Sequence, residues 1–148
     1  MRCSASVRAG QLGIFILITA FCSACAAENA KQISLHIGQH VFEVEVAATP
    51  QQRGRGLMQR NALPVNGGML FVFEQPGRHC FWMRNTPLPL SIAFAGPNGR
   101  IINLADMQPL TDTFHCASAD ARYALEVSQG GFQQRGIVPG DQITGLPQ

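Results

Sequence analysis

The chain has 148 residues, of which 46% are hydrophobic, 7% aromatic and 14% charged. This length accommodates one domain and excludes a large multidomain enzyme. The formal charge is +2, and beyond Arg2 and Arg8 nine basic side chains balance nine acidic ones. That balance argues against nucleic acid or an anionic membrane face as the main partner.

The N-terminus has the three parts of an export signal. Arg2 and Arg8 are positively charged, residues 13–21 (GIFILITAF) are apolar, and residues 23–27 (SACAA) are small. The apolar run is shorter than the ~20 residues that a membrane-spanning helix needs. The pattern predicts that residues 1–26 are a signal peptide or lipoprotein signal, and that residues 27–148 form a single domain outside the cytoplasm.

Two routes of signal processing fit this segment. Ala24-Cys25-Ala26 offers an ordinary cleavage site after Ala26, whereas Cys25 resembles the lipid-carrying cysteine of a lipoprotein. Cys22 stands where lipoprotein sites usually have an aliphatic residue, so both routes remain open. If Cys25 is lipidated, the following residue, Ala26, resembles that of lipoproteins sorted to the outer membrane rather than retained at the inner one. We therefore expect a periplasmic or outer-membrane-associated protein that contacts the membrane through no more than an N-terminal lipid anchor.

The first predicted elements of the domain are a hairpin and a short helix. Apolar residues alternate over 33–37 and again over 42–46, on either side of Gly38-Gln39, which predicts two paired strands with one buried face. Thr49-Pro50-Gln51-Gln52 then has the pattern of a capping box with proline at the first helical position. We expect one short helix near residues 50–58.

The rest of the chain has the pattern of short strands separated by turns. We expect a buried strand over 69–73, a turn at Gln75-Pro76-Gly77 and a return strand over 80–83. Further elements are predicted at 92–94, 100–104, 123–127 and, as a strand, turn and strand, 137–143. About eight short strands and one helix predict a mainly β fold, a small barrel or sandwich.

Cysteine usage fits an exported domain. Cys3, Cys22 and Cys25 lie in or beside the signal, which leaves Cys80 and Cys116 as an even pair in the domain. We expect a disulfide between them. The alternative is two buried thiols that act as small apolar residues.

Several sequence blocks resemble one protein family. The blocks are Leu57-Met58-Gln59-Arg60, residues 68–73 (GMLFVF), residues 81–86 (FWMRNT), and Leu125-Glu126-Val127 with Gly140-Asp141. In this order they resemble domain of unknown function 192, and the resemblance covers about residues 41–143. It implies a small, largely β protein, often exported, with no agreed biochemical activity. The family pattern usually reaches Leu-Asp before an apolar strand, but here Ser91 follows Leu90, so this chain lacks the carboxylate at that position.

One group of residues is our candidate ligand-binding site. Trp82 offers an apolar platform beside the polar pair Asn85 and Thr86, and Arg53 and Glu126 add charged groups. Each residue also has a purely structural interpretation. In that interpretation Trp82 is a core residue and Asn85-Thr86 forms a turn. Arg53 and Arg60 then form structural or solvated ion pairs.

A copper site is an alternative for an exported protein. Thioether and imidazole groups suit copper, although their spacing does not require it and core packing is the usual role of methionine. The candidate ligands are Met58, Met69, Met83, Met107, His40, His79 and His115.

An enzymatic role has less support. A glycan hydrolase needs two carboxyl groups across a cleft, and the candidates are Glu74, Asp106, Glu126 and Asp141. The sequence contains no G-x-S-x-G, H-E-x-x-H or phosphate-binding glycine loop. We therefore expect an exported, non-catalytic module without a cofactor that binds an unknown small molecule or an envelope protein. A glycan- or peptide-directed hydrolase and a periplasmic copper-binding protein remain the alternatives.

Overall fold

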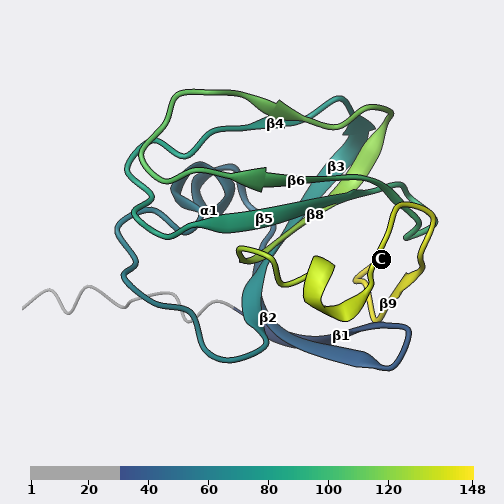
Figure 1. The fold of residues 1–148 in the computed structure, drawn as a ribbon. Helices are drawn as coiled ribbons and strands as arrows, with labels where there is room; N and C mark the ends of the chain where they lie inside the picture. Colours follow the sequence, from purple (N-terminus) through teal and green to yellow (C-terminus); the bar gives the residue numbers. More distant parts are fainter. Residues whose placement is uncertain (1–30) are drawn as a thin grey trace, which may run out of the picture.

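The computed structural model describes residues 31–148, so the predicted export signal lies outside the described residues. The chain folds into a mostly β structure built on a curled, half-barrel sheet (Figure 1). This confirms the predicted mainly β class. The elements between residues 31 and 148 are β1 (Gln32–Ile37), β2 (His40–Ala47), α1 (Pro50–Arg55), β3 (Gly67–Gly77), β4 (Cys80–Phe81), β5 (Leu90–Ala95), β6 (Ile101–Met107), β7 (His115–Cys116), β8 (Ala121–Ser128), the 3-10 helix η1 (Gln133–Arg135) and β9 (Ile143–Thr144).

Seven strands form the main sheet, in the order β6-β5-β8-β3-β2-β1-β9. Neighbouring strands are antiparallel except β2 and β3, which are parallel. The crossover between these two strands contains α1, since a parallel pair cannot be joined by a tight hairpin. The two remaining strands, β4 and β7, form a small separate sheet.

The first hairpin and the helix form where they were predicted. β1 and β2 pair from Gln32↔Glu45 to Ile37↔His40, around the turn at Gly38. Thr49 caps α1, and the capping box with Gln52 is complete. The helix ends at Arg55 rather than near residue 58, because Gly56 has a φ of 48° and leaves the helical conformation.

Three local predictions were wrong. The strand β3 continues through the predicted turn at residues 75–77, and a register shift there removes the need for a ladder hydrogen bond from Pro76. The predicted return strand at 80–83 is shortened to β4, which pairs with β7 instead of β3. Residues 137–138 form no strand, because their backbone belongs to a turn in which the carboxylate of Asp141 accepts a hydrogen bond from the Val138 N–H.

The sheet has an apolar core on each face. Side chains alternate along a strand, so Leu125 and Val127 of β8 pack in one core and Ala124 packs in the other. The core around Leu125 is covered by the C-terminal region, including Phe132. The opposite core lies beneath α1, its following turn and the small β4-β7 sheet.

One glycine allows the two central strands to approach. A Cβ added to Gly68 of β3 would lie 2.3 Å from the backbone oxygen of Glu126 on β8. Any side chain at this position would therefore force β3 and β8 apart. The glycine of the GMLF block fixes the strand spacing at Glu126.

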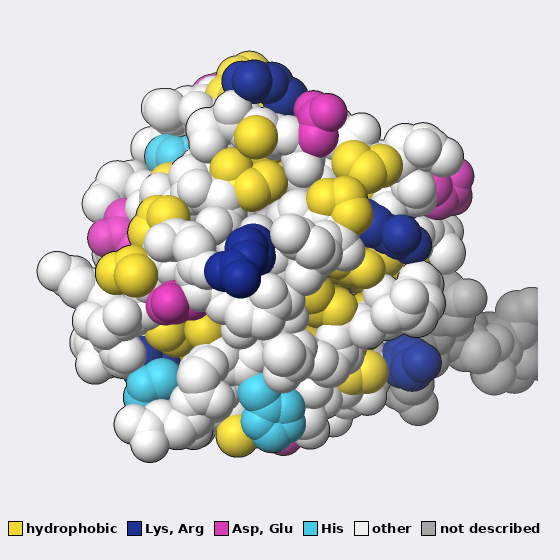
Figure 2. All heavy atoms as spheres, turned by 90° about the vertical axis from the view of Figure 1, so that its right-hand side faces the viewer, with side chains coloured by type: hydrophobic (Ala, Val, Ile, Leu, Met, Phe, Trp, Pro, Cys, Tyr) yellow, Lys and Arg dark blue, Asp and Glu magenta, His cyan; other side chains and the backbone are white. Residues whose placement is uncertain are grey.

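The surface gives two further observations. Between residues 31 and 148 no helix combines the length and apolar character needed to cross a membrane. On the face in Figure 2, basic and acidic side chains are interspersed rather than gathered in a patch of one sign.

Cys80 and Cys116 form the predicted disulfide, which joins β4 to β7. The bond closes a loop with a sequence separation of 36 residues. The loss of unfolded-state entropy for such a loop corresponds to about 4 kcal/mol. We predict that replacing both cysteines with alanine lowers the free energy of unfolding by a few kcal/mol, as measured by urea denaturation. A loss below about 1 kcal/mol would show that the bond adds little to stability.

Candidate functional site

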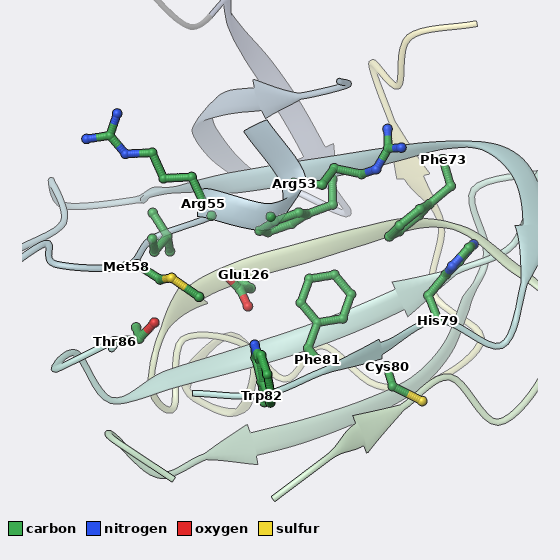
Figure 3. Close-up of a pocket in the computed structure, with 14 residues that line it drawn as sticks. Arg53, Arg55, Met58, Phe73, His79, Cys80, Phe81, Trp82, Thr86 and Glu126 are labelled. Carbon is green, nitrogen blue, oxygen red and sulfur yellow. The ribbon is translucent and has the colours of Figure 1, made fainter. Parts of the chain in front are cut away.

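A cavity of about 300 Å³ opens between the sheet, α1 and the segment around β4 (Figure 3). The turn after α1 forms one side, β3 and β8 form the floor, and residues 79–82 form the opposite side. Most of its walls are apolar. The residues that line it are Arg53, Gly54, Arg55, Gly56, Leu57, Met58, Phe71, Phe73, His79, Cys80, Phe81, Trp82, Thr86 and Glu126.

Glu126 is the acidic residue of this cavity and comes from the middle of β8. By strand alternation its side chain faces the same core as Ala124. Its partners on the neighbouring strands are Met69 of β3 and Ile92 of β5, both buried in that core. Figure 3 shows its carboxyl group directed into the cavity. A carboxyl group is thus placed on an otherwise apolar floor.

The environment of this carboxyl group changes its acidity. Glu126 is 4% exposed, and no basic side chain of residues 31–148 forms a salt bridge with it. Desolvation raises the pKa of Glu126 from its ordinary value near 4.5 to about 8. At neutral pH the side chain is therefore mainly a neutral carboxylic acid, which carries both a hydrogen-bond donor and an acceptor.

Aromatic rings form the wall beside the carboxyl group. Phe81 of β4 packs edge-on against Phe71 of β3, with ring centres 4.8 Å apart. It also meets Phe94 of β5 at 5.7 Å. Phe73 stacks on His79 with ring centres 3.5 Å apart. These contacts hold β4 over the sheet and give the cavity a rigid apolar side.

Trp82 is at the edge of the cavity and is not a fully buried core residue. Its ring stacks on Phe114, with centres 5.6 Å apart, and the Arg84 guanidinium lies 3.9 Å from the ring centre. Arg84 in turn pairs with Asp112. In Figure 3 the nitrogen-bearing edge of the indole is turned toward Glu126. The neighbouring side chains fix the ring with its N–H donor facing the cavity.

The basic residues of α1 lie at the rim. Arg53 donates hydrogen bonds to the backbone oxygens of Ala48 and Val72, and its guanidinium lies 5.3 Å from the centre of the Phe73 ring. It therefore links α1 to β3. Figure 3 shows both Arg53 and Arg55 extending away from Glu126. Neither arginine neutralises the buried carboxyl group.

The cavity brings together four of the five predicted ligand-binding residues: Arg53, Trp82, Thr86 and Glu126. Asn85 does not line it. Asn85 is exposed, has a φ of 61°, and its backbone oxygen accepts a hydrogen bond from the Gln59 N–H, so it belongs to a turn.

The second arginine considered in the sequence does not contact the cavity. Arg60 pairs with Glu45 of β2 and not with Glu126. The pKa of Glu45 is lowered, chiefly by the hydrogen bond from Arg60. This pair is structural.

The candidate copper ligands are dispersed. Met69, Met83 and Met107 are buried in the core beneath α1, whereas Met58 and His79 line the cavity. His40 begins β2 and His115 begins β7. Within the described part of the chain, no group of three or more His, Cys, Asp and Glu side chains is arranged to hold a metal ion.

The four candidate carboxyl groups for hydrolysis are also separated. Glu126 lines the cavity, while Glu74, Asp106 and Asp141 do not. Asp106 accepts a hydrogen bond from the hydroxyl of Ser91 on the neighbouring strand. The position at which the family usually has aspartate therefore carries a hydroxyl bonded to a carboxylate from the next strand.

The sequence interpretation missed most of the aromatic wall. The sequence predicts a buried strand over residues 69–73 but assigns neither Phe71 nor Phe73 to a cavity. Their alternation with Leu70 and Val72 was the signal that places them on the face of Glu126. Phe81 carried no comparable signal, because its position depends on the disulfide-linked pairing of β4 with β7.

The raised pKa of Glu126 predicts a specific pH dependence of stability. The folded state holds this proton up to about pH 8, whereas the unfolded state releases it near 4.5, so burial of the carboxyl group destabilises the fold as the pH rises between these values. We predict that Glu126→Gln is more stable than the wild type at pH 8 by about 4 kcal/mol. The advantage shrinks toward zero near pH 4.5. Urea denaturation across this range measures it.

The matched control is Glu43→Gln, which makes the same substitution at an exposed position on β2. Its stability should follow the wild-type pH profile. Parallel profiles for Glu126→Gln and the wild type from pH 5 to 8 would contradict the predicted desolvation.

Comparison with known proteins places the chain in a family. Residues 33–145 match the model of DUF192, described as an uncharacterized ACR. A solved Novosphingobium aromaticivorans protein of unknown function has 33% sequence identity and a TM-score of 0.76, and the match covers 80% of this chain and 88% of that one. A Sinorhizobium meliloti protein described as a candidate transcription regulator has 31% identity and a TM-score of 0.71, over 76% and 90% of the two chains. No curated protein matches. The chain belongs to the uncharacterised family DUF192.

Proposed function

We propose that this protein is an exported, envelope-associated domain that binds a small ligand in the Glu126 cavity without transforming it. The observation that carries this proposal is a buried carboxyl group that faces an aromatic-walled cavity and has no basic partner. Burying a polar group without a partner costs free energy. A ligand that bonds to the carboxyl group would offset this cost.

The size and chemistry of the cavity support ligand binding. Small-molecule sites usually have volumes of ~300–1,000 Å³, apolar walls and a few placed polar groups. The cavity is at the lower end of this range, at about 300 Å³. Its polar groups include the carboxyl of Glu126, the indole N–H of Trp82 and the hydroxyl of Thr86. These features favour a ligand no larger than a monosaccharide or a short peptide.

Two observations support the proposed location outside the cytoplasm. The first 26 residues have the composition of an export signal, with Cys25 as the candidate for lipid attachment. The disulfide joins two exposed cysteines, and such bonds persist in oxidising compartments.

The single carboxyl group favours binding over hydrolysis. Glycosidases use two carboxyl groups about 5 to 9.5 Å apart. Among the described residues that line the cavity, Glu126 is the only acidic one. Beyond residue 26 nine basic residues balance nine acidic ones, a charge balance that does not favour nucleic-acid binding by this chain.

The proposal predicts a ligand-dependent rise in melting temperature. The purified domain is tested with cupric ion, glycan fragments, peptidoglycan fragments and fatty acids. A ligand at ~100 times its Kd adds about 2.7 kcal/mol of stability, which raises the Tm of a domain of this size by several degrees. Trp82→Phe should reduce this shift more than it lowers the Tm of the free protein.

Phe132→Leu is the matched control, because Phe132 packs in the core on the opposite face of the sheet. We expect it to lower the Tm and leave the ligand shift intact. Equal losses of stability and binding in Trp82→Phe would place Trp82 in the core and the ligand elsewhere. The absence of a shift with every compound would contradict the proposed function.

A further inference from the structure

The polar groups of the cavity also restrict the class of its ligand, an inference that rests on the proposed function. We propose that the cavity recognises an uncharged secondary amide, as found in N-acylated sugars and blocked peptides. The amide N–H would donate to the carboxyl group of Glu126, and the amide oxygen would accept from the indole N–H of Trp82. The acyl group would pack against the aromatic wall.

The orientation of the two polar side chains supports an amide. Glu126 rises from the floor on β8, and Trp82 follows β4 on the opposite side. The indole nitrogen is turned toward the carboxyl group across the cavity. The site thus offers an acceptor and a donor from opposite sides. A secondary amide is a rigid, neutral group that carries one N–H donor and one oxygen acceptor.

The charges around the cavity disfavour an ionic ligand. Arg53 and Arg55 of α1 lie at its rim, and His79 lies before β4. The arginines repel a cationic ligand as it approaches. An anionic group placed at the floor would lose its hydration next to a carboxyl group without a basic partner. A neutral hydrogen-bonding group avoids both costs.

The protonation state of Glu126 gives the inference a pH signature. The pKa near 8 leaves the carboxyl group neutral at pH 7, when it can meet an amide without burying a charge. A neutral ligand that fills the cavity would exclude water from the carboxyl group, so binding above pH 8 carries the cost of further desolvating a charged carboxylate. Amide binding should therefore weaken about tenfold from pH 7 to pH 9, following the protonated fraction. A cationic amine would show the opposite trend until the amine itself loses its proton.

The walls accommodate the apolar part of such a ligand. Phe71 on the floor packs against Phe81, and Leu57 and Met58 follow α1 on the opposite side of the cavity. These side chains carry no charge. An acetyl methyl group or a small alkyl side chain buried here leaves water for apolar contacts, a favourable contribution that a free amine lacks.

The test compares ligands that differ at one group. N-acetylglucosamine is compared with glucosamine and glucose, and N-acetylalanine methyl ester with alanine methyl ester. Because Trp82 is the sole tryptophan of the chain, its indole N–H gives a single NMR signal that reports binding. We expect at least one acetylated compound to bind ten times more tightly than its amine at pH 7. The tighter of the two acetylated compounds identifies the sugar or the peptide as the source.

Two variants separate an amide ligand from a cation. Glutamine resembles the neutral form of glutamate, so Glu126→Gln should keep amide binding within about threefold at pH 7 and abolish its decline toward pH 9. Trp82→Phe removes the indole donor and should weaken binding at least fivefold. Since Phe has no indole signal, the variant is followed by its thermal shift.

The outcomes distinguish this inference from the proposed function. If the amines bind more tightly than the acetylated compounds, and Glu126→Gln weakens amine binding at least tenfold, the inference of an amide ligand is wrong. The proposed binding site would still stand. Tighter binding of glucose than of N-acetylglucosamine, with no binding of N-acetylalanine methyl ester, would also contradict the amide inference. If neither these compounds nor the broader panel changes the indole signal or the Tm, the result would contradict both the inference of an amide ligand and the proposed binding function.

Discussion

Desolvation of the Glu126 carboxyl group is the constraint on which this account of the cavity depends. A carboxylate buried without a basic partner is unfavourable, and the group holds its proton up to a pKa of about 8. The neighbouring groups do not relieve the cost, because Arg53 bonds to backbone oxygens and Arg60 pairs with Glu45. A fold retains such a group at a cost to stability, which is typical of functional sites.

The rest of the structure holds this group in place. Alternation along β8 sends Leu125 and Val127 into one core and Glu126 toward the other face. Gly68 lets β3 approach β8 at this point, since a side chain there would meet the backbone of Glu126. The disulfide joins β4 to β7 and so keeps the aromatic wall over the sheet. The main sheet forms the floor of the cavity, Gly68 sets the strand spacing at Glu126, and the disulfide holds the aromatic wall.

Local patterns predicted much of the fold, while tertiary pairing determined the rest. The hairpin β1-β2 and the capping box of α1 follow from alternation and from side-chain to backbone hydrogen bonds within a few residues. The length and pairing partner of β4 were predicted wrongly, because the strand pairs with β7, more than thirty residues away in sequence. Proline at 76 suggested a turn, although an irregular part of a strand tolerates it equally well. Glu126 and Trp82 were identified as candidates from the sequence, but their mutual orientation depends on contacts such as that between Trp82 and Phe114.

The most direct test of this account is an NMR titration of the side-chain carboxyl carbon of Glu126 in the unliganded protein. Glu126→Gln identifies its signal by removing it. We predict a titration midpoint near pH 8, as expected for a desolvated carboxyl group without a basic partner. A midpoint near the ordinary value of 4.5 would show that the group is hydrated or paired, and would contradict the central claim.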